Sequence, residues 1–456
     1  MSFRTLVKKL IPKGLFKAVE PYGHLAEAIF FNVSNGFPAR GIKVIGVTGT
    51  NGKTSTAFIM HSMLNDAGYN VGLMSTVAYG YKSDIKPQVE HMTSVDVPTL
   101  MKRLKELRKQ GCEWLVLETT SHALAQHRMW GIPYTVAVMT NITHEHLDYH
   151  GTFEKYRDAK RMMFKQTNRN RRGLRTGIVN AEDPSADLFA SDVKNPITYG
   201  IKNGDIRATN VKSSPSGSEF DVVGPSDLKL HIKVNLPGTF NVFNSLAVVG
   251  TGVAIGLEPK TIEKGIAALE GVEGRMTRID EGQDFDVIVD YAHTPDSFEK
   301  LFKDLKPVVK GKLIVMFGSA GRRDEAKRAV QGGLAGKYAD EVIVTEEDDR
   351  DMDGLAILDE IAAGAEKEGK VRDKDLFLVH DRTEAINFAV KRAKAGDTIL
   401  LLGKGHEKDI LRNGPKAAEM RHLQQDDHNP DRVVEFPWDE IGTAHEALKQ
   451  LSSRTK

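Results

Sequence analysis

The sequence predicts an α/β protein with two doubly wound domains that follow an N-terminal segment. From Ile42 onward, short runs rich in β-branched residues alternate with helical patterns, which is typical of βαβ units in a mainly parallel sheet. A second series of the same kind begins near residue 285. Between the two series, residues 205–235 alternate polar with apolar positions, which favours an antiparallel ribbon in or beside the first sheet.

Length and composition restrict the class of protein. The chain has 456 residues, of which 40% are hydrophobic, and this suffices for about three domains with packed cores. Because 63 Lys and Arg residues balance 62 Asp and Glu residues, we expect neither disorder nor a nucleic-acid-binding surface. A single cysteine, Cys112, excludes an internal disulfide and a zinc ribbon, so we expect a reducing compartment, the cytoplasm.

Residues 1–40 form the N-terminal segment, which mixes basic and apolar residues. Pro12, Glu20, Pro21 and Glu27 interrupt it before it reaches the roughly 20 apolar residues of a membrane span. We therefore predict neither a signal peptide nor an anchor, and expect the apolar face to pack on the body of the protein. The alternative is contact with a membrane surface through basic residues, namely Arg4, Lys8, Lys9, Lys13 and Lys17.

A glycine-rich loop between a strand and a helix opens the central domain, which we place at residues 41–270. Backbone N–H groups of such a loop turn toward a phosphate, Lys53 neutralises its charge, and the Thr54 hydroxyl suits Mg²⁺. The strict Walker spacing is not met, because Val47 stands where that pattern has its first glycine. The flanking strand and helix still favour a P-loop ATPase domain with these nucleotide-binding residues: Gly49, Thr50, Asn51, Gly52, Lys53 and Thr54.

Two polar residues follow predicted strands of this domain. Ligands of open α/β sheets bind beyond the carboxyl ends of strands, where Glu118 and His146 are expected to lie. A carboxylate and an imidazole at this edge can face the phosphate loop and suit a second divalent ion. Lys160 lies in a helical segment, Phe153 to Phe164, and taken alone is most simply a solvated charge.

Seven segments of the chain resemble the Mur ligase family, the ATP-dependent amide-forming enzymes of peptidoglycan synthesis. The resemblance covers residues 41 to about 435, and the segments read GVTGTNGKTST, LETTSHALAQHR, NITHEHLDYHGTFEKYRDAK, LPGTFNVFN, GRM, VDYAHTPD and GKGHE. HLDYHG, DYAHTPD and GKGHE are most similar to the branch that adds the third residue of the peptide. The resemblance implies a Rossmann-like ligase domain at residues 271–456 and an ATP site completed when two domains meet.

The resemblance also implies roles at the ATP site. Lys160 matches a lysine that reacts with CO₂ to form a carbamate, which turns a cation into a metal-ligating carboxylate. Asn244 matches an adenine contact, Arg275 the arginine at the γ-phosphate and Asp290 the ribose contact. The implied cofactors are ATP and two Mg²⁺ ions. The implied metal ligands are Thr54, Glu118, His146 and Lys160, and the implied catalytic residues are Lys53, His146 and Lys160.

Two substrates follow from the same resemblance, a UDP-muramoyl dipeptide and a diamino acid. The family's Thr-Thr-Pro reads Thr93-Ser94-Val95 here, and its Asp-Asn-Pro-Arg reads Glu347-Asp348-Asp349-Arg350. Because the arginine is kept, we favour meso-diaminopimelate, with L-lysine next. The dipeptide residues are Thr93, Ser94, Thr120, Gln126 and Arg128. The amino-acid residues are Arg323, Asp348, Arg350, Gly403 and Glu407.

One departure and two alternatives accompany this interpretation. Typical members have a longer segment before the phosphate loop, forming a domain that grips uridine diphosphate, whereas 45 residues precede Gly46 here. A folylpolyglutamate synthase-like ligase uses the same chemistry, but HLDYHG, DYAHTPD and GKGHE argue against it. A non-catalytic nucleotide-binding protein is expected to have lost Glu118, His146 or Lys160, and all three are present. We expect a monomer.

Overall fold

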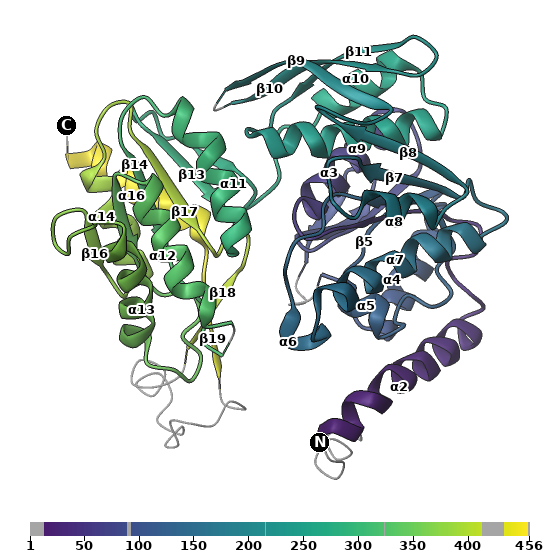
Figure 1. Cartoon of the computed structure of the whole chain (residues 1–456), viewed down its shortest axis with the longest axis horizontal. Coiled ribbons are helices and arrows are strands. Elements are labelled where there is room, and N and C mark those ends of the chain that lie inside the picture. Colours follow the sequence, from purple (N-terminus) through teal and green to yellow (C-terminus); the bar gives the residue numbers. More distant parts are fainter. Residues whose placement is uncertain (1–12, 89–92, 215, 323, 413–432, 455–456) are drawn as a thin grey trace. The chain divides into compact units, whose positions relative to one another are not determined.

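The computed structural model describes residues 13–88, 93–214, 216–322, 324–412 and 433–454. These residues separate into two compact units (Figure 1). The first unit extends to residue 270, apart from two short stretches at 214–216 and 236–238 that group with the second unit. Each unit contains one large sheet with its own buried core.

An 11-stranded, mainly parallel sheet forms the first unit, which confirms the predicted α/β class. Parallel pairing links β1 to β5 and β6 and continues from β6 through β7 and β8. The strand order is β11 (Leu228–Val234), β10 (Gly217–Gly224), β9 (Ile206–Ser214), β8 (Asn195–Gly200), β7 (Thr176–Asn180), β6 (Tyr134–Met139), β1 (Lys43–Thr48), β5 (Trp114–Glu118), β2 (Val71–Met74), β3 (Ala78–Tyr81) and β4 (Asp84–Pro87).

The central strands of this sheet are buried on both faces. Every residue of β5 and β6 is buried, which explains why these strands are continuous apolar runs without polar alternation. The ribbon predicted for residues 205–235 is present, since β10 and β11 pair antiparallel and extend the sheet beyond β9. The parallel strands bring their carboxyl ends to one edge, and this edge positions the phosphate loop.

Helices complete the first unit. They are α3 (Lys53–Asp66), α4 (Val97–Lys109), α5 (Ser121–Ala125), α6 (Leu147–His150), α7 (Phe153–Arg169), α8 (Ala186–Ser191), α9 (Thr239–Ala254) and α10 (Pro259–Ala267). Side-chain caps define the starts of α4, α5 and α7, where Asp96, Thr120 and Thr152 accept hydrogen bonds from the N–H groups of Thr99, Ala123 and Lys155.

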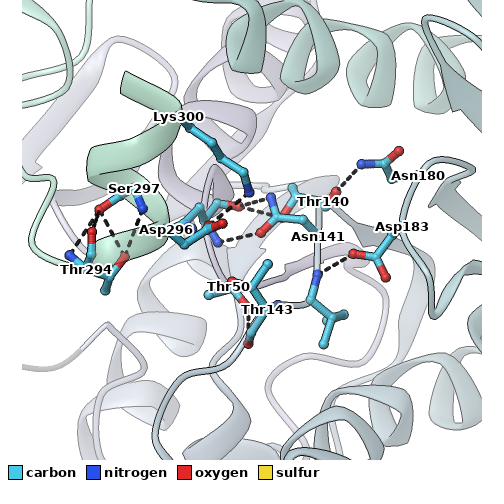
Figure 2. Close-up of polar contacts among 12 residues, drawn as sticks. Thr50, Thr140, Asn141, Thr143, Asn180, Asp183, Thr294, Asp296, Ser297 and Lys300 are labelled. Atoms are coloured by element: carbon cyan, nitrogen blue, oxygen red, sulfur yellow. Dashed lines mark hydrogen bonds and ion pairs between the residues drawn. The ribbon is translucent and has the colours of Figure 1, made fainter. Parts of the chain in front are cut away.

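The second unit contains a six-stranded sheet that is parallel except for its first strand. The order is β12 (Thr277–Ile279), β13 (Asp286–Asp290), β17 (Thr398–Leu402), β14 (Leu313–Phe317), β15 (Glu341–Val344) and β16 (Leu376–Leu378), and a separate pair joins β18 (Asp409–Arg412) to β19 (Val434–Pro437). Its helices are α11 (Pro295–Leu305), the 3₁₀ turn η1 (Lys306–Val308), α12 (Ala326–Tyr338), α13 (Gly354–Lys367), α14 (Arg382–Arg392) and α16 (Glu440–Arg454). A capping box of Thr294 and Ser297 begins α11 (Figure 2).

The N-terminal helix α2 (Lys13–Ser34) continues through Pro21 and belongs to the first unit. The expectation that its apolar face packs on the body is wrong for the described side chains. The buried face presents His24, Ala28 and Asn32, whereas Phe30 and Val33 are 64% and 59% exposed. The Asn32 amide donates to the Trp130 carbonyl oxygen at 2.9 Å, so polar contacts help to select the packed face. Among the helices that the structure describes, none combines the length and apolar character needed to cross a bilayer.

Candidate active site

The phosphate loop lies between β1 and α3 and has the backbone that an anion site requires. Gly52 is the N-cap of α3 at φ +82°, in the left-handed region that favours glycine. A Cβ on Gly52 would overlap the Asn244 side chain, and one on Gly49 would overlap the Thr140 hydroxyl. Because glycine has no side chain, the N-cap leaves the first N–H groups of α3 without a side-chain cap. This is the arrangement that binds phosphate.

The segment after β6 holds the phosphate loop in place (Figure 2). The Asn141 side chain accepts from the Asn51 N–H at 3.0 Å and donates to the Asn51 carbonyl oxygen at 3.0 Å. The Thr140 hydroxyl donates to the same carbonyl oxygen at 2.6 Å. The Thr50 hydroxyl accepts from the Thr143 N–H at 2.9 Å. These bonds preorganise the loop, so little ordering remains when a phosphate binds.

The cation of the loop and the possible metal ligands lie on neighbouring elements. The Lys53 ammonium donates to the Thr50 carbonyl oxygen at 2.7 Å. The buried Thr54 hydroxyl donates to the Glu118 carboxylate at 3.0 Å. The Thr76 hydroxyl donates to the other Glu118 oxygen at 2.9 Å and lies 2.9 Å from the Thr93 hydroxyl. A hydroxyl and a carboxylate in contact form an oxygen donor set of the kind that Mg²⁺ prefers.

Lys160 is not the solvated charge that its helix position suggested. Its side chain is 2% exposed, and its ammonium donates to the Gly49 carbonyl oxygen at 2.7 Å. Burial, together with the nearby Lys53 charge, lowers the pKa of Lys160 well below its ordinary value. Such a shift favours the neutral amine over the ammonium, and the neutral amine is a nucleophile.

His146 lies in a cluster of rings at the start of α6. It adopts a left-handed backbone at φ +54°, and its side chain is 42% exposed. The His122 ring lies 4.6 Å from the His146 ring, and the His146 Nε2 lies 3.7 Å from a Glu145 oxygen. The Tyr156 hydroxyl donates to the same Glu145 oxygen at 3.1 Å. Direct contacts thus join Thr54 with Glu118 and Lys160 with Gly49, while His146 lies among aromatic residues.

The residues expected to bind the muramoyl dipeptide come together at the end of β5. The Thr120 N–H donates to the Ser94 hydroxyl at 3.1 Å. The buried Arg128 guanidinium donates to the Ser94 and Val95 carbonyl oxygens and to the Gln126 side chain at 3.0 Å. The Arg128 contacts order the backbone around Ser94 and Thr120 and keep a positive charge at this edge of the sheet.

The expected nucleotide contacts of the second unit lie just before β12 and at the carboxyl end of β13. The Asp290 carboxylate accepts from the N–H groups of Met276 and Ala292, both at 2.8 Å. Burial raises the pKa of Asp290 above its ordinary value. The Arg275 guanidinium lies 4.5 Å from the centre of the Tyr291 ring, a cation–π contact. In the first unit, the buried Asn244 amide donates to Asn241 at 2.9 Å, beside Gly52.

The expected amino-acid pocket is a network of charges around Lys404. The buried Lys404 ammonium contacts Asp348 at 3.0 Å and Glu407 at 2.6 Å. Although burial opposes it, these carboxylates raise the pKa of Lys404 above its ordinary value. Arg350 lies 4.0 Å from Asp348, and Asp349 contacts His380 at 2.7 Å. Both aspartates therefore have charged or polar partners other than Arg350, namely Lys404 for Asp348 and His380 for Asp349.

Gly403 and Glu347 complete the described part of this pocket, while Arg323 lies outside the described residues. Gly403 has φ +101°, and a Cβ there would lie 2.9 Å from a Glu347 oxygen. That oxygen is buried and has no hydrogen-bond partner within the described residues. Burial raises the pKa of Glu347. A buried carboxylate oxygen without a hydrogen-bond partner is suited to an ammonium group from a ligand.

Several residues of these networks were missed from the sequence. Thr76 follows β2 at the same sheet edge as Glu118, so the strand-end rule could have found it. Lys404 stands inside GKGHE, and Tyr291 inside DYAHTPD, where its hydroxyl donates to Glu407 at 3.0 Å. Glu347 belongs to the acidic run already singled out, but its burial has no local sequence signal.

Comparisons with known proteins agree with these features. Residues 47–252 match the Mur ligase middle domain, and residues 274–405 match the Mur ligase glutamate ligase domain. A UDP-N-acetylmuramyl-tripeptide synthetase of Roseiflexus sp. (strain RS-1) is 39% identical, over 91% of this chain and 80% of the relative. A UDP-N-acetylmuramoyl-L-alanyl-D-glutamate–2,6-diaminopimelate ligase of Bacillus licheniformis is 38% identical, over 84% of this chain and 77% of the relative.

A solved structure is also similar. It is titled as a UDP-N-acetylmuramoyl-L-alanyl-D-glutamate–2,6-diaminopimelate ligase, and it is 27% identical with a TM-score of 0.62. The similarity covers 95% of this chain and 83% of that chain. Mur ligases use ATP and Mg²⁺ to form amide bonds. The identities, the coverage and both domain matches lead to one conclusion, that the chain belongs to the Mur ligase family and is an ATP-dependent amide-bond ligase.

Proposed function

We propose that the chain is a tripeptide synthetase, which joins a diamino acid to the D-glutamyl γ-carboxylate of UDP-N-acetylmuramoyl-L-Ala-D-Glu in peptidoglycan synthesis. One observation supports this most strongly. The charge network of Asp348, Arg350, Lys404 and Glu407 brings both signs of charge together, as a diamino acid with two carboxylates requires. Relatives named as tripeptide synthetases and diaminopimelate ligases support the same reaction. We favour meso-diaminopimelate, and L-lysine is next.

The first unit activates the acceptor in this proposal. Gly49, Thr50, Asn51, Gly52 and Lys53 bind the ATP phosphates, with Lys53 stabilising the charge that develops during phosphoryl transfer. The acceptor carboxylate attacks the γ-phosphorus, the bond to the β-phosphate oxygen breaks, and ADP leaves. Further contacts come from Asn244 at the adenine, and from Arg275 and Asp290 of the second unit at the γ-phosphate and ribose.

We assign the metal sites to Thr54, Glu118, His146 and a carbamate on Lys160. When bound, Mg²⁺ neutralises phosphate charge and orients the oxygens for transfer. The contact between Thr54 and Glu118 fits such an ion. A neutral Lys160 amine attacks CO₂ and loses a proton, which gives a carbamate of single negative charge. The lowered pKa of Lys160 supports this modification, because only the neutral amine has the lone pair that the reaction needs.

The acceptor and the amino acid meet at an acyl phosphate. We place the muramoyl dipeptide at Thr93, Ser94, Thr120, Gln126 and Arg128. The amine of the diamino acid attacks the acyl carbon, phosphate leaves with one oxygen of the original carboxylate, and the amine loses a proton as the amide forms. Exclusion of water protects the acyl phosphate from hydrolysis. Glu407 and Asp348 then bind ammonium groups, and Arg350 binds the distal carboxylate of the diamino acid.

Product formation tests this proposal. The purified chain is supplied with ATP, Mg²⁺ and each pairing of two acceptors, UDP-muramoyl dipeptide or a folate monoglutamate, with meso-diaminopimelate, L-lysine, L-ornithine or L-glutamate. We expect a new amide product, detected by mass spectrometry, with the muramoyl acceptor and a diamino acid. A product from folate and glutamate instead would establish the folylpolyglutamate alternative, and no product from any pair would contradict the proposed substrates. We also propose that the chain is a monomer of the cytoplasm, where ATP and nucleotide-linked substrates are available.

A further inference from the structure

Tyr156 of α7 connects two segments of the candidate active site that lie far apart in the sequence. Its side chain is fully buried, and its hydroxyl lies 2.9 Å from the Thr50 hydroxyl of the phosphate loop. The same hydroxyl donates to a Glu145 carboxylate oxygen at 3.1 Å, one residue before His146. A buried hydroxyl needs hydrogen-bond partners, and Tyr156 has both of them in side chains that flank the expected phosphate site.

The direction of these hydrogen bonds follows from their chemistry. An ionised carboxylate only accepts, so the single Tyr156 proton goes to Glu145. Burial and the Glu145 charge raise the pKa of Tyr156 above its ordinary value, which keeps that proton in place. The Thr50 hydroxyl accepts from the Thr143 N–H at 2.9 Å (Figure 2). Its own proton is then supplied to Tyr156, with the Thr143 carbonyl oxygen at 3.2 Å as the other acceptor. A hydrogen-bond chain therefore runs from Thr50 through Tyr156 to Glu145.

Lys160 makes a second contact between α7 and the phosphate loop. It lies one helical turn after Tyr156, and its ammonium donates to the Gly49 carbonyl oxygen at 2.7 Å. The ammonium also lies 4.7 Å from the centre of the Tyr156 ring, a cation–π contact. Two successive turns of α7 thus hold two successive loop residues, Gly49 through its backbone and Thr50 through its side chain.

Glu145 extends the hydrogen-bond chain toward His146. The Glu145 oxygen that accepts from Tyr156 lies 3.7 Å from the His146 Nε2. His146 has a left-handed backbone at φ +54°, a conformation that is uncommon for residues other than glycine. Because Tyr156 anchors the Glu145 carboxylate, it restrains the position of the His146 segment relative to the phosphate loop.

A second buried tyrosine of the same unit shows what a structural hydroxyl does. Tyr199 of β8 is also fully buried, and its hydroxyl donates to the Met139 carbonyl oxygen of β6 at 3.0 Å. That bond joins strands of one sheet through a backbone atom. Both partners of the Tyr156 hydroxyl are instead side chains of residues outside strands and helices, Thr50 and Glu145. The Tyr156 hydroxyl therefore acts on the arrangement of loops rather than on the assembly of the sheet.

We propose that Tyr156 is a positioning residue for the Mg²⁺-bound nucleotide, acting through the hydrogen-bond chain from Thr50 to Glu145. The chain holds the phosphate loop and the segment before α6 in one arrangement, so less ordering remains when the nucleotide binds. The inference uses the dependence of Mur ligases on ATP and Mg²⁺. It does not depend on which acceptor or amino acid the chain joins.

Isothermal titration calorimetry of the full chain with ADP and Mg²⁺ tests this role, because nucleotide binding is measured without acceptor or amino acid. Tyr156→Phe keeps the ring beside Lys160 and removes only the hydroxyl. We expect about tenfold weaker ADP binding in this variant, the effect of losing hydrogen bonds that support the loop. Unchanged ADP affinity in Tyr156→Phe would overturn the proposal.

Tyr199→Phe is the matched control, since it also removes one buried, hydrogen-bonded hydroxyl. Denaturant unfolding should show that both variants lose stability, while only Tyr156→Phe loses ADP affinity. An equal loss of ADP affinity in the two variants would show a general effect of a weakened fold, and the proposal would be withdrawn.

Glu145→Ala breaks the same chain at a side chain that is 15% exposed, where folding is less sensitive to substitution. Alone it should weaken ADP binding severalfold. Combined with Tyr156→Phe it should add little, because both changes break one hydrogen-bond chain. Unchanged ADP affinity in Glu145→Ala, or losses that add fully in the double variant, would contradict the proposed coupling.

Discussion

The Lys160 ammonium donates a hydrogen bond to the Gly49 carbonyl oxygen at 2.7 Å, across 111 positions of sequence. The contact holds this residue of α7 against the phosphate loop. A chemical change at Lys160 therefore alters the charge and the hydrogen bonding of the loop where phosphate is expected to bind. A protonated lysine here adds charge beside Lys53, and burial and that charge both act against protonation. The lowered pKa favours the neutral amine that CO₂ modifies, and the contact with Gly49 places the modified group beside the phosphate loop.

Lys160→Ala should reduce amide formation at least about a hundredfold, because the proposed carbamate ligand is lost. Short carboxylates such as formate or acetate should restore part of the rate by occupying the vacated space. Initial rates with and without added carboxylate measure this effect. Lys165→Ala, at an exposed position of the same helix, is the control and should keep its activity. Full activity in Lys160→Ala would remove the metal role from this residue.

Lys53→Ala should lower kcat at least about a hundredfold while the chain remains folded, since the Lys53 ammonium donates to the loop backbone and its charge serves the transferring phosphate. Turnover by released phosphate and folding by circular dichroism are measured on the same sample. Lys102→Ala, at an exposed position of α4, provides the comparison. Near-normal turnover with alanine at position 53 would contradict the assignment of the phosphate loop.

The stability of the first unit should depend on the protonation of His61. Burial lowers the pKa of His61 from 6.5 to about 4, so the unfolded chain takes up a proton there before the folded chain does. The free energy of unfolding should therefore fall as pH drops through this interval, by about 2 kcal/mol between pH 7 and pH 5 from this residue. Denaturant unfolding of the original chain and His61→Gln at both pH values measures the difference. Parallel pH dependence in the two chains would show that His61 does not contribute.

Sequence patterns predicted the fold better than they predicted the contacts of the site. Alternating strand and helix patterns predicted the mainly parallel sheet, because buried parallel strands need continuous apolar runs. Strand ends located Glu118 because sheet topology brings such ends together. The burial of Lys160 depends on a contact with Gly49 that no local pattern encodes. The prediction that the apolar face of α2 packs on the body was wrong, since the Asn32 side chain helps to select the packed side by donating to the Trp130 carbonyl oxygen.

Arg350→Ala tests the choice of diamino acid. Loss of a paired guanidinium costs on the order of 2 kcal/mol, so kcat/KM for meso-diaminopimelate should fall roughly 30-fold. The value for L-lysine, which has no distal carboxylate, should stay unchanged or improve. Arg372→Ala, at an arginine whose partners are Asp359 and Glu366, is the control. A preference for L-lysine in the original chain that persists in Arg350→Ala would withdraw diaminopimelate as the favoured substrate.

The transfer of oxygen from acceptor to phosphate tests the central claim, an amide ligase that works through an acyl phosphate. The γ-carboxylate of the muramoyl dipeptide is labelled with ¹⁸O and incubated with the chain, ATP, Mg²⁺ and the diamino acid, and the released phosphate is analysed by mass spectrometry. We predict one ¹⁸O atom in each phosphate that accompanies an amide product, with phosphate release dependent on both acceptor and amino acid. Unlabelled phosphate, or phosphate released equally well without the acceptor, would contradict the account.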